Sequence, residues 1–264
     1  DANGISVPTS WDELNAAAEK LQAAGIIPFA HGGQAWQDAT VFEAVAMGIG
    51  GNNYYKNCYV DLKETCLRSE TTVKVFDQMR KLQGFTDEGS PGRDWNVATG
   101  MVIEGKAGFQ IMGDWAKGEF TAAGKVPGVD YYCAATPSNN GYLYNVDSFI
   151  FYKTSDPDKQ EGQKLLAKLM MGKNFQKVFN LYKGSIPARL DVPMDEFDKC
   201  AKTSNSDIKT AGASGGLVPS FAHGMAQGNT MKAALQDVIT EHFNSDMSSV
   251  DAANALADSV LDNM

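Results

Sequence analysis

Apolar residues recur at intervals of three and four along much of the chain, a spacing typical of helices with one buried face. The first such stretch follows Ser10-Trp11-Asp12-Glu13, which reads as a capping box: the Ser10 hydroxyl accepts from the amide three residues on, and Glu13 reaches back. Gly25 is expected to end this helix. Further helices are predicted over residues 39–48, 68–85, 97–105, 174–182, 225–244 and 249–263.

A long helix is also predicted to begin at Ser155-Asp156-Pro157. Proline suits the first helical turn, and the side chain before it can cap the helix. Its buried face is expected to consist of Leu165, Leu166, Leu169 and Met170. By contrast, residues 203–216 are rich in serine, glycine and asparagine, so this stretch is expected to be irregular.

Short apolar runs between the helices predict strands. The run at residues 26–30 is expected to be a buried strand, and residues 107–112 alternate in the manner of a half-buried strand. Residues 131–135 and 143–152 are also expected to be extended. Because helices alternate with short strands, the pattern predicts an α/β fold in layers.

Composition excludes several classes of protein. With 264 residues, of which 43% are hydrophobic, the chain can form one large or two smaller domains with a buried core. The net charge of −9 argues against binding to nucleic acid. No apolar run approaches the roughly 20 residues of a membrane helix, and Glu43 interrupts the longest candidate. The first residues show neither the basic start nor the apolar core of a signal peptide, so the mature chain begins here or an upstream part has been removed.

Four cysteines leave two interpretations open. All four can be buried free thiols, or they can form two disulfides in an oxidising compartment. Of the three possible pairings, Cys58–Cys66 with Cys133–Cys200 is favoured because short loops close at low entropic cost. The histidines are scattered and no CxxC occurs, so neither a zinc site nor another metal site is predicted.

No catalytic or cofactor motif is found. Gly48-Ile49-Gly50-Gly51 looks like part of a dinucleotide loop, but it follows a helix rather than a strand, so no cofactor is predicted. Aromatic and hydrogen-bonding residues instead fall at the ends of predicted elements, where they can line a ligand site. These residues are Trp36, Trp95, Trp115, Asn145, Asp147, Lys183 and His223.

This mixture suits a sugar. A pyranose packs its C–H faces on flat aromatic rings, and its hydroxyl rim needs donors and acceptors. Each residue also has an ordinary structural explanation: the tryptophans can be core residues, Asp147 a turn residue, His223 a packing residue and Lys183 a surface charge.

The order of several segments resembles the extracytoplasmic solute-binding proteins of bacterial ABC sugar importers, and within them the glucose-binding branch. The resemblance covers nearly all of the chain. It is carried by the following segments: Val7-Pro-Thr-Ser-Trp-Asp-Glu-Leu14, His31-Gly-Gly-Gln-Ala-Trp36, Gly105-Lys-Ala-Gly-Phe-Gln-Ile-Met-Gly-Asp-Trp-Ala116, Met112-Gly-Asp-Trp-Ala-Lys-Gly-Glu-Phe120, Asn145-Val-Asp147, Lys183-Gly-Ser-Ile-Pro-Ala-Arg189 and Pro219-Ser-Phe-Ala-His223.

This resemblance implies a periplasmic-binding-protein type II-like fold: two α/β lobes joined by a hinge, which close on a sugar. Trp36 and Trp115 would be the aromatic residues of the cleft. Asn145 and Asp147 would be hydroxyl partners, with Lys183 and His223 as donors. Trp95 is a weaker candidate without a clear motif. The resemblance also favours the pairing Cys133–Cys200 in an exported, periplasmic protein.

One departure concerns length. Family members begin with about a hundred residues of a first lobe before the segment found here at residue 8. Residues 1–148 and 199–264 therefore resemble the C-terminal lobe, and residues 149–198 a segment that returns to a mostly absent N-terminal lobe. The missing lobe, a monosaccharide such as glucose and the membrane permease of the importer are the expected partners.

Three functional hypotheses follow. The first is capture of a monosaccharide by hinge closure, without enzymatic activity. The second is a glycoside-processing enzyme that uses the same aromatic cleft, with Asp114 and Asp147 as its carboxylates about 5–10 Å apart. The third is a carbohydrate-binding or adhesion domain, or a structural domain with no small ligand.

Overall fold

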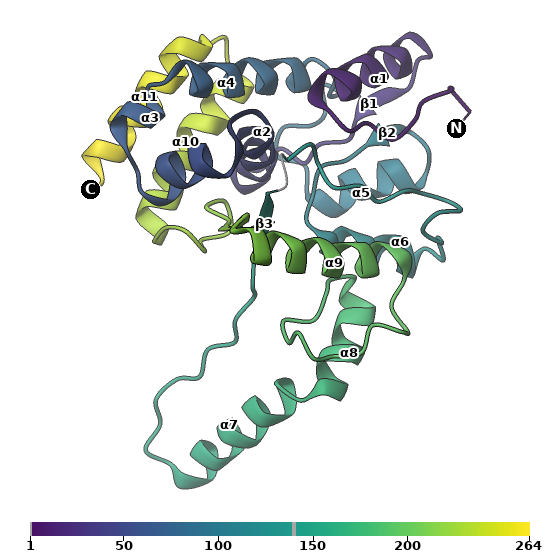
Figure 1. Cartoon of the computed structure of the whole chain (residues 1–264), viewed down its shortest axis with the longest axis vertical. Helices are drawn as coiled ribbons and strands as arrows, with labels where there is room; N and C mark the ends of the chain where they lie inside the picture. The colour runs from purple at the N-terminus through teal and green to yellow at the C-terminus, as the bar shows by residue number, and fades with distance from the viewer. Residues whose placement is uncertain (1, 139–140) are drawn as a thin grey trace.

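The computed structural model describes residues 2–138 and 141–264 (Figure 1). Its first half contains α1 Trp11–Ala23, β1 Ile27–Phe29, α2 Ala35–Tyr55, the π-helical turn η1 Lys56–Val60, α3 Glu64–Leu67, α4 Glu70–Gln83, α5 Trp95–Ile103, β2 Ala107–Phe109, the 3₁₀ turn η2 Asp114–Ala116 and α6 Lys117–Ala122. Its second half contains β3 Tyr142–Tyr144, α7 Pro157–Met170, α8 Lys173–Lys183, α9 Lys199–Ser214, β4 Leu217–Pro219, α10 Asn229–Asn244 and α11 Ser249–Asp262.

The main core lies where α2, α4, α10 and α11 pack together. Phe42 of α2 is fully buried there, and its ring lies 5.0 Å from Phe76 and 6.2 Å from Phe221, measured between centroids. These helices carry their apolar side chains on the faces that meet, so burial of those faces is the main stabilising contribution.

Two small parallel sheets accompany the helices. β1 pairs with β2, with Ile27 opposite Ala107, and β3 pairs with β4, with Tyr142 opposite Leu217. Parallel pairing requires long connections between partner strands, and helices supply them here. The predicted α/β class is confirmed, with strands shorter than the sequence pattern suggests.

The first helix begins as predicted. The Ser10 side chain accepts from the Glu13 amide at 3.2 Å. The Glu13 carboxylate reaches back one residue further than expected, to the amide and the hydroxyl of Thr9 at 2.7 and 2.8 Å. Both contacts satisfy donors near the helix start, which fixes where α1 begins.

Helix α2 is longer than the predicted 39–48. It starts at Ala35 and runs through the glycines at positions 48 and 50, with a kink at Gly51, where φ is +73°. Most of its first half is buried on every side, so packing compensates for the poor helix propensity of glycine.

Two sequence-based expectations are wrong. Residues 131–135 do not form a strand: they lie largely exposed at the surface, where Tyr131 stacks on Phe120 at 4.1 Å between ring centroids. Residues 203–216 are mostly helical rather than irregular, because they belong to α9. An Asp198 cap to the Ala201 amide and the left-handed Gly215 at the C-terminus define that helix, and they outweigh its weak helix formers.

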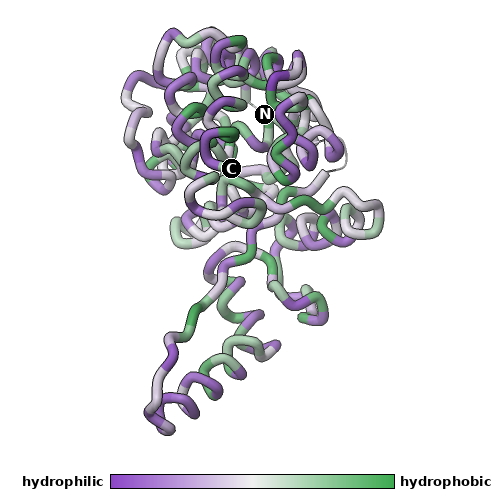
Figure 2. Tube along the Cα trace, turned by 90° about the vertical axis from the view of Figure 1, so that its left-hand side faces the viewer, coloured by the Kyte–Doolittle hydropathy of each residue, from purple (hydrophilic) through white to green (hydrophobic). Residues whose placement is uncertain are grey.

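The buried face expected for α7 is also wrong. Asp156 caps the helix as predicted, but Leu165, Leu166 and Leu169 are 59%, 47% and 61% exposed. Only Met170 is buried. Helix α7 and the chain leading to it project away from the main body, and hydrophobic positions follow this projection in Figure 2. The leucines have the right spacing for a buried face, yet no described segment covers them.

Both predicted disulfides are present. Cys58 bonds to Cys66 beside α2, and Cys133 bonds to Cys200 at the start of α9. The second bond joins the surface segment before β3 to the helix that packs on β3 and β4. Within the described residues, no helix combines the length and the apolar character needed to cross a membrane.

Candidate functional site

Each of the four strands leads into a segment that carries candidate residues. The chain continues from β1 to Trp36, from β2 to Trp115, from β3 to Asn145 and Asp147, and from β4 to His223. In parallel α/β sheets, ligands bind beyond the carboxyl ends of the strands, because the loops there converge. The topology thus delivers side chains from distant parts of the sequence to neighbouring positions.

Two indoles flank one imidazole. The ring centroid of His223 lies 6.0 Å from that of Trp36 and 5.2 Å from that of Trp115, both in edge-to-face geometry. All three side chains are half-buried. Trp36 Nε1 donates to Gln34 Oε1 at 2.8 Å, which holds that ring in place. The result is a small aromatic surface that combines two flat faces with a polar ring.

A charged pair completes the cluster. Lys183, the last residue of α8, forms an ion pair with Asp147, and Asn145 Nδ2 donates to Asp147 Oδ1 at 3.3 Å. The Lys183 hydrogen bond lowers the pKa of Asp147, and Coulomb interactions with Lys183 and His223 act in the same direction. Asp147 is therefore ionised at neutral pH.

A close backbone approach couples Lys183 to Trp115. Gly184 has φ +91°, and a Cβ on it would lie 2.5 Å from the Gly118 amide nitrogen. Asp114 Oδ2 accepts from the Ile186 amide at 3.3 Å, and burial raises the pKa of Asp114. Because residues 114 and 184 each adjoin a candidate residue, this contact sets the position of the lysine relative to the indole.

A buried carboxylate lies behind His223. Glu43 of α2 accepts from Tyr55 Oη at 3.0 Å and from the Ala222 amide at 3.3 Å, and Ser220 Oγ lies 2.7 Å from Oε1. Ser220 Oγ is also 2.9 Å from His223 Nδ1. The sequence pattern does not mark Glu43 as a site residue; its one signal is that it is the single charge in the apolar run of residues 41–49.

The family of the chain follows from the similarity of its sequence to known proteins. Residues 2–170 match the family model described as bacterial extracellular solute-binding protein. The chain belongs to this family. It is 47% identical over 261 residues to a "Probable sugar-binding periplasmic protein" of Brucella suis. This alignment covers 98% of the chain and 62% of the Brucella protein. A protein with the same name from Rhizobium meliloti is 44% identical, over 98% of this chain and 63% of the Rhizobium protein.

Solved structures of binding proteins share the fold of this family member. A chitin oligosaccharide binding protein superposes with a TM-score of 0.76 at 17% identity, covering 99% of this chain and 66% of that one. A Streptococcus pneumoniae solute-binding protein in complex with the blood group A-trisaccharide superposes with a TM-score of 0.70 at 18% sequence identity. The superposition covers 100% of this chain and 67% of that one. Relatives and neighbours are solute-binding proteins and not enzymes. The chain spans about three fifths of the length of the curated relatives it matches.

The structure brings six of the seven candidate residues of this solute-binding protein together and leaves one aside. Trp95 begins α5, where its carbonyl accepts from Thr99 Oγ1 and Gln110 Nε2 at 2.9 and 3.1 Å. Among the described residues, no ring contact joins it to the other two candidate tryptophans. Trp95 therefore stands apart from the cluster, half-buried at the start of α5.

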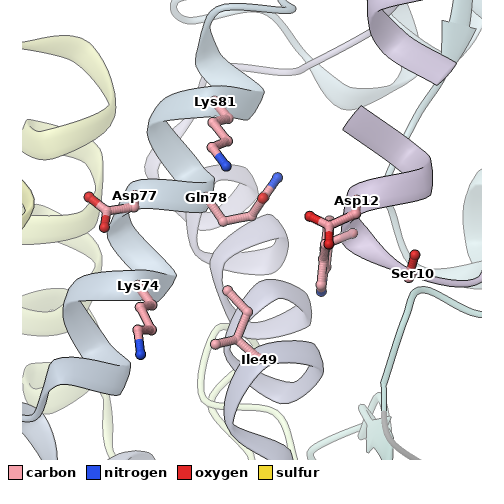
Figure 3. A pocket seen from close by; sticks show the side chains of 8 residues that line it. Ser10, Asp12, Ile49, Lys74, Asp77, Gln78 and Lys81 are labelled. Carbon is pink, nitrogen blue, oxygen red and sulfur yellow. The ribbon is translucent and has the colours of Figure 1, made fainter. Parts of the chain in front are cut away.

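A separate pocket of about 430 Å³ lies between α1, α2 and α4 (Figure 3). Its lining residues are Ser10, Trp11, Asp12, Ile49, Lys74, Asp77, Gln78 and Lys81. It shares no residue with the aromatic cluster, and its charges of both signs lie at its exposed rim. Within residues 2–138 and 141–264, no group of three or more histidine, cysteine, aspartate or glutamate side chains is arranged to hold a metal ion.

Proposed function

We propose that this chain forms one wall of a cleft that binds a monosaccharide, glucose or a close hexose, in the binding protein of a periplasmic ABC sugar importer. The observation that carries the proposal is the convergence of two indoles, an imidazole and the Asp147–Lys183 pair. The names of the relatives support the ligand class.

The chemistry of the cluster matches the two kinds of surface on a pyranose. Trp36 and Trp115 supply flat apolar faces for the C–H groups of the sugar. Ionised Asp147 can accept from two hydroxyls at once, while Lys183 and Asn145 can donate. Each hydrogen bond to a charged partner contributes about 1.5–3 kcal/mol net, so the ion pair favours a ligand rich in hydroxyls.

We further propose that the projecting part of residues 149–198 packs against a second lobe in the longer protein. Large apolar side chains are exposed along it, at Phe149, Ile150, Tyr152 and in the leucines of α7. An open groove of about 530 Å³ on α8 is lined by Phe175, Val178, Phe179, Tyr182 and Lys183. Monomeric proteins rarely expose so continuous an apolar surface. The greater length of the relatives makes a second lobe the occupant that we favour.

Lys183 belongs both to this groove and to the aromatic cluster, which supports a ligand position between the two proposed lobes. Closure of a second wall over the sugar would then shift an equilibrium between open and closed forms, and a transporter can recognise the closed form. This arrangement requires binding and release without any bond-making step.

A sugar titration tests the proposal. One wall supplies about half of the enclosing surface, so we expect this chain to bind glucose with a dissociation constant of about 1 mM or weaker. NMR spectra should show that the indole N–H signals of Trp36 and Trp115 shift on addition of glucose. Micromolar binding would contradict the half-site arrangement, and unshifted indole signals with every hexose would contradict the sugar site.

Two lysines on α8 give a matched pair of variants. Lys183 pairs with Asp147, whereas Lys177 pairs with Glu196 at 2.8 Å outside the cluster. Lys183→Ala should remove the shifts caused by glucose, and Lys177→Ala should preserve them. Incubation with nitrophenyl glycosides tests the enzyme hypothesis: turnover that is lost in Asp147→Asn would favour a hydrolase over the binding protein proposed here.

A further inference from the structure

The hydrogen bonds behind His223 have a defined direction. Glu43 is 3% exposed in an otherwise apolar part of α2, and its oxygens meet donors from Tyr55, Ser220 and the Ala222 amide. An ionised carboxylate can only accept. A buried charge needs such partners to persist, and Glu43 has three.

The Ser220 hydroxyl links this carboxylate to the imidazole. Its oxygen lies 2.7 and 2.9 Å from the two oxygens of Glu43, 2.9 Å from His223 Nδ1 and 3.1 Å from the His223 amide, which donates to it. The hydroxyl has a single proton. Because its oxygen lies close to both oxygens of Glu43, that proton points to the carboxylate, which avoids repulsion between lone pairs. The remaining lone pair of Ser220 must then accept from Nδ1, so Nδ1 carries a proton.

We propose that Glu43, acting through Ser220, holds His223 in the tautomer that is protonated at Nδ1 and presents a bare lone pair at Nε2. His223 Nε2 is buried beside the two indoles and has no hydrogen-bond partner among the described residues. An unpaired buried polar atom is costly, which makes this nitrogen a position where a ligand group is favoured.

The tautomer determines which ligand group fits, an extension that rests on the proposed sugar function. With a lone pair at Nε2, neutral His223 accepts from a sugar hydroxyl instead of donating to it, the reverse of the role expected from the sequence. Lys183 and Asn145 then remain as donors, and His223 joins Asp147 as an acceptor. Glu43 and Ser220 are positioning residues in this arrangement, because they act through the imidazole.

The charged groups around the imidazole are few. Glu43 Oε1 lies 3.6 Å from Nδ1 on the side of α2. Asp147, paired with Lys183, faces the ring from the segment after β3. The tautomer is a property of the neutral ring, so it is measured at a mildly alkaline pH of about 8.

Long-range proton–nitrogen NMR of the ligand-free chain at pH 8 tests the tautomer directly, since it distinguishes a protonated ring nitrogen from a bare one. The signal of His223 is identified by its loss in His223→Asn. We expect Nδ1 protonated and Nε2 bare in the unsubstituted chain. In Ser220→Ala and Glu43→Gln we expect the Nε2-protonated form or a mixture of the two forms.

A matched control lies on the same helix. Asp38 is also a buried carboxylate of α2, and it accepts from His31 Nε2 at 2.7 Å and from Thr240 at 2.8 Å. Asp38→Asn disturbs a comparable buried network, so it should leave the His223 signals unchanged. A proton on Nε2 in the unsubstituted chain, or an unaltered tautomer in both Ser220→Ala and Glu43→Gln, would overturn the proposal.

Glucose titration of the same samples separates this inference from the proposed function. We expect Ser220→Ala to weaken glucose binding about tenfold, the equivalent of about 1.4 kcal/mol. If the tautomer is as stated and no hexose binds, the sugar function fails and the positioning role stands. If glucose binds and Nε2 carries the proton, the sugar function stands and this inference fails.

Discussion

The main body and the projection formed by α7 with the chain leading to it contain similar apolar residues in opposite surroundings. Phe42 in the body is fully buried among aromatic rings, whereas Leu166 on α7 is 47% exposed although its helix has correct caps and spacing. Helical periodicity is a local property, but burial requires a partner surface. The contrast separates residues whose burial stabilises this chain from apolar residues that no described segment covers.

The largest difference in stability is expected between a substitution in the core and one on α7. Phe42→Ala removes a buried ring that contacts Phe76 and Phe221, so we expect the free energy of unfolding to fall by about 3–5 kcal/mol. Leu166→Ala should change it by less than about 0.5 kcal/mol. Urea unfolding followed by circular dichroism measures both values. Similar losses for the two variants would show that α7 is packed in solution.

Two glycines extend the comparison to the backbone. Gly184→Ala forces a side chain into a left-handed conformation against the Gly118 amide, and we expect a loss of about 2–3 kcal/mol and displacement of Lys183. Gly162 lies inside α7 with no neighbour within 4 Å of an added Cβ. Gly162→Ala should instead stabilise that helix by about 1 kcal/mol. Thermal unfolding measures the stability of both variants. Unchanged stability in Gly184→Ala would contradict the close approach of the two backbone segments.

A buried histidine makes the body sensitive to acid. Burial, and then the charge of Arg80, lower the pKa of His242 from 6.5 to about 4. The unfolded chain therefore takes up a proton between pH 6.5 and 4 that the folded chain does not, so stability is greatest above pH 6.5 and falls with pH across this window. The ring is almost fully buried, so we expect this histidine to account for about 3 kcal/mol. Urea unfolding midpoints measured between pH 7 and 4 should fall less with pH in His242→Leu than in the unsubstituted chain. An equal fall in both proteins would contradict the assignment to His242.

The smallest effects concern helix caps. Ser10→Ala removes the cap of α1, which packs on the body, so we expect global stability to fall by about 1 kcal/mol. Asp156→Ala removes the cap of α7 and should speed amide exchange only within that helix. Hydrogen exchange measured residue by residue distinguishes global from local opening. Faster exchange throughout the chain in Asp156→Ala would show that α7 is coupled to the body.

Local signals in the sequence predicted much of the fold. The capping box at Ser10, the proline start of α7 and the apolar spacing of α4 all correspond to helices in the structure. The same reasoning failed at residues 131–135 and 203–216. In the first case Tyr131 makes an isolated bridge to Pro127, but no described strand pairs with the segment to form a ladder. In the second case the caps and the packing of α9 outweigh weak propensity.

The candidate site shows the same division. Residue type and position at element ends indicate seven candidate residues. Six of them lie together in the structure and Trp95 does not. Sequence patterns do not indicate Glu43, which lies behind His223, because its contacts are with Tyr55 and Ser220, 12 and 177 residues away. Spacing along the chain carries no information about such partners.

The sequence by itself determined the capped helix starts at Trp11 and Pro157, the apolar spacing of the helices and the kinds of side chain available to a ligand, since these depend on neighbours within one or two turns. Only the tertiary structure decided that strand ends gather those side chains, that Gly184 brings the lysine to the indole, and that the leucines of α7 stay exposed. The physical reason is that contacts between distant residues depend on how the chain closes its long loops and on which surfaces meet.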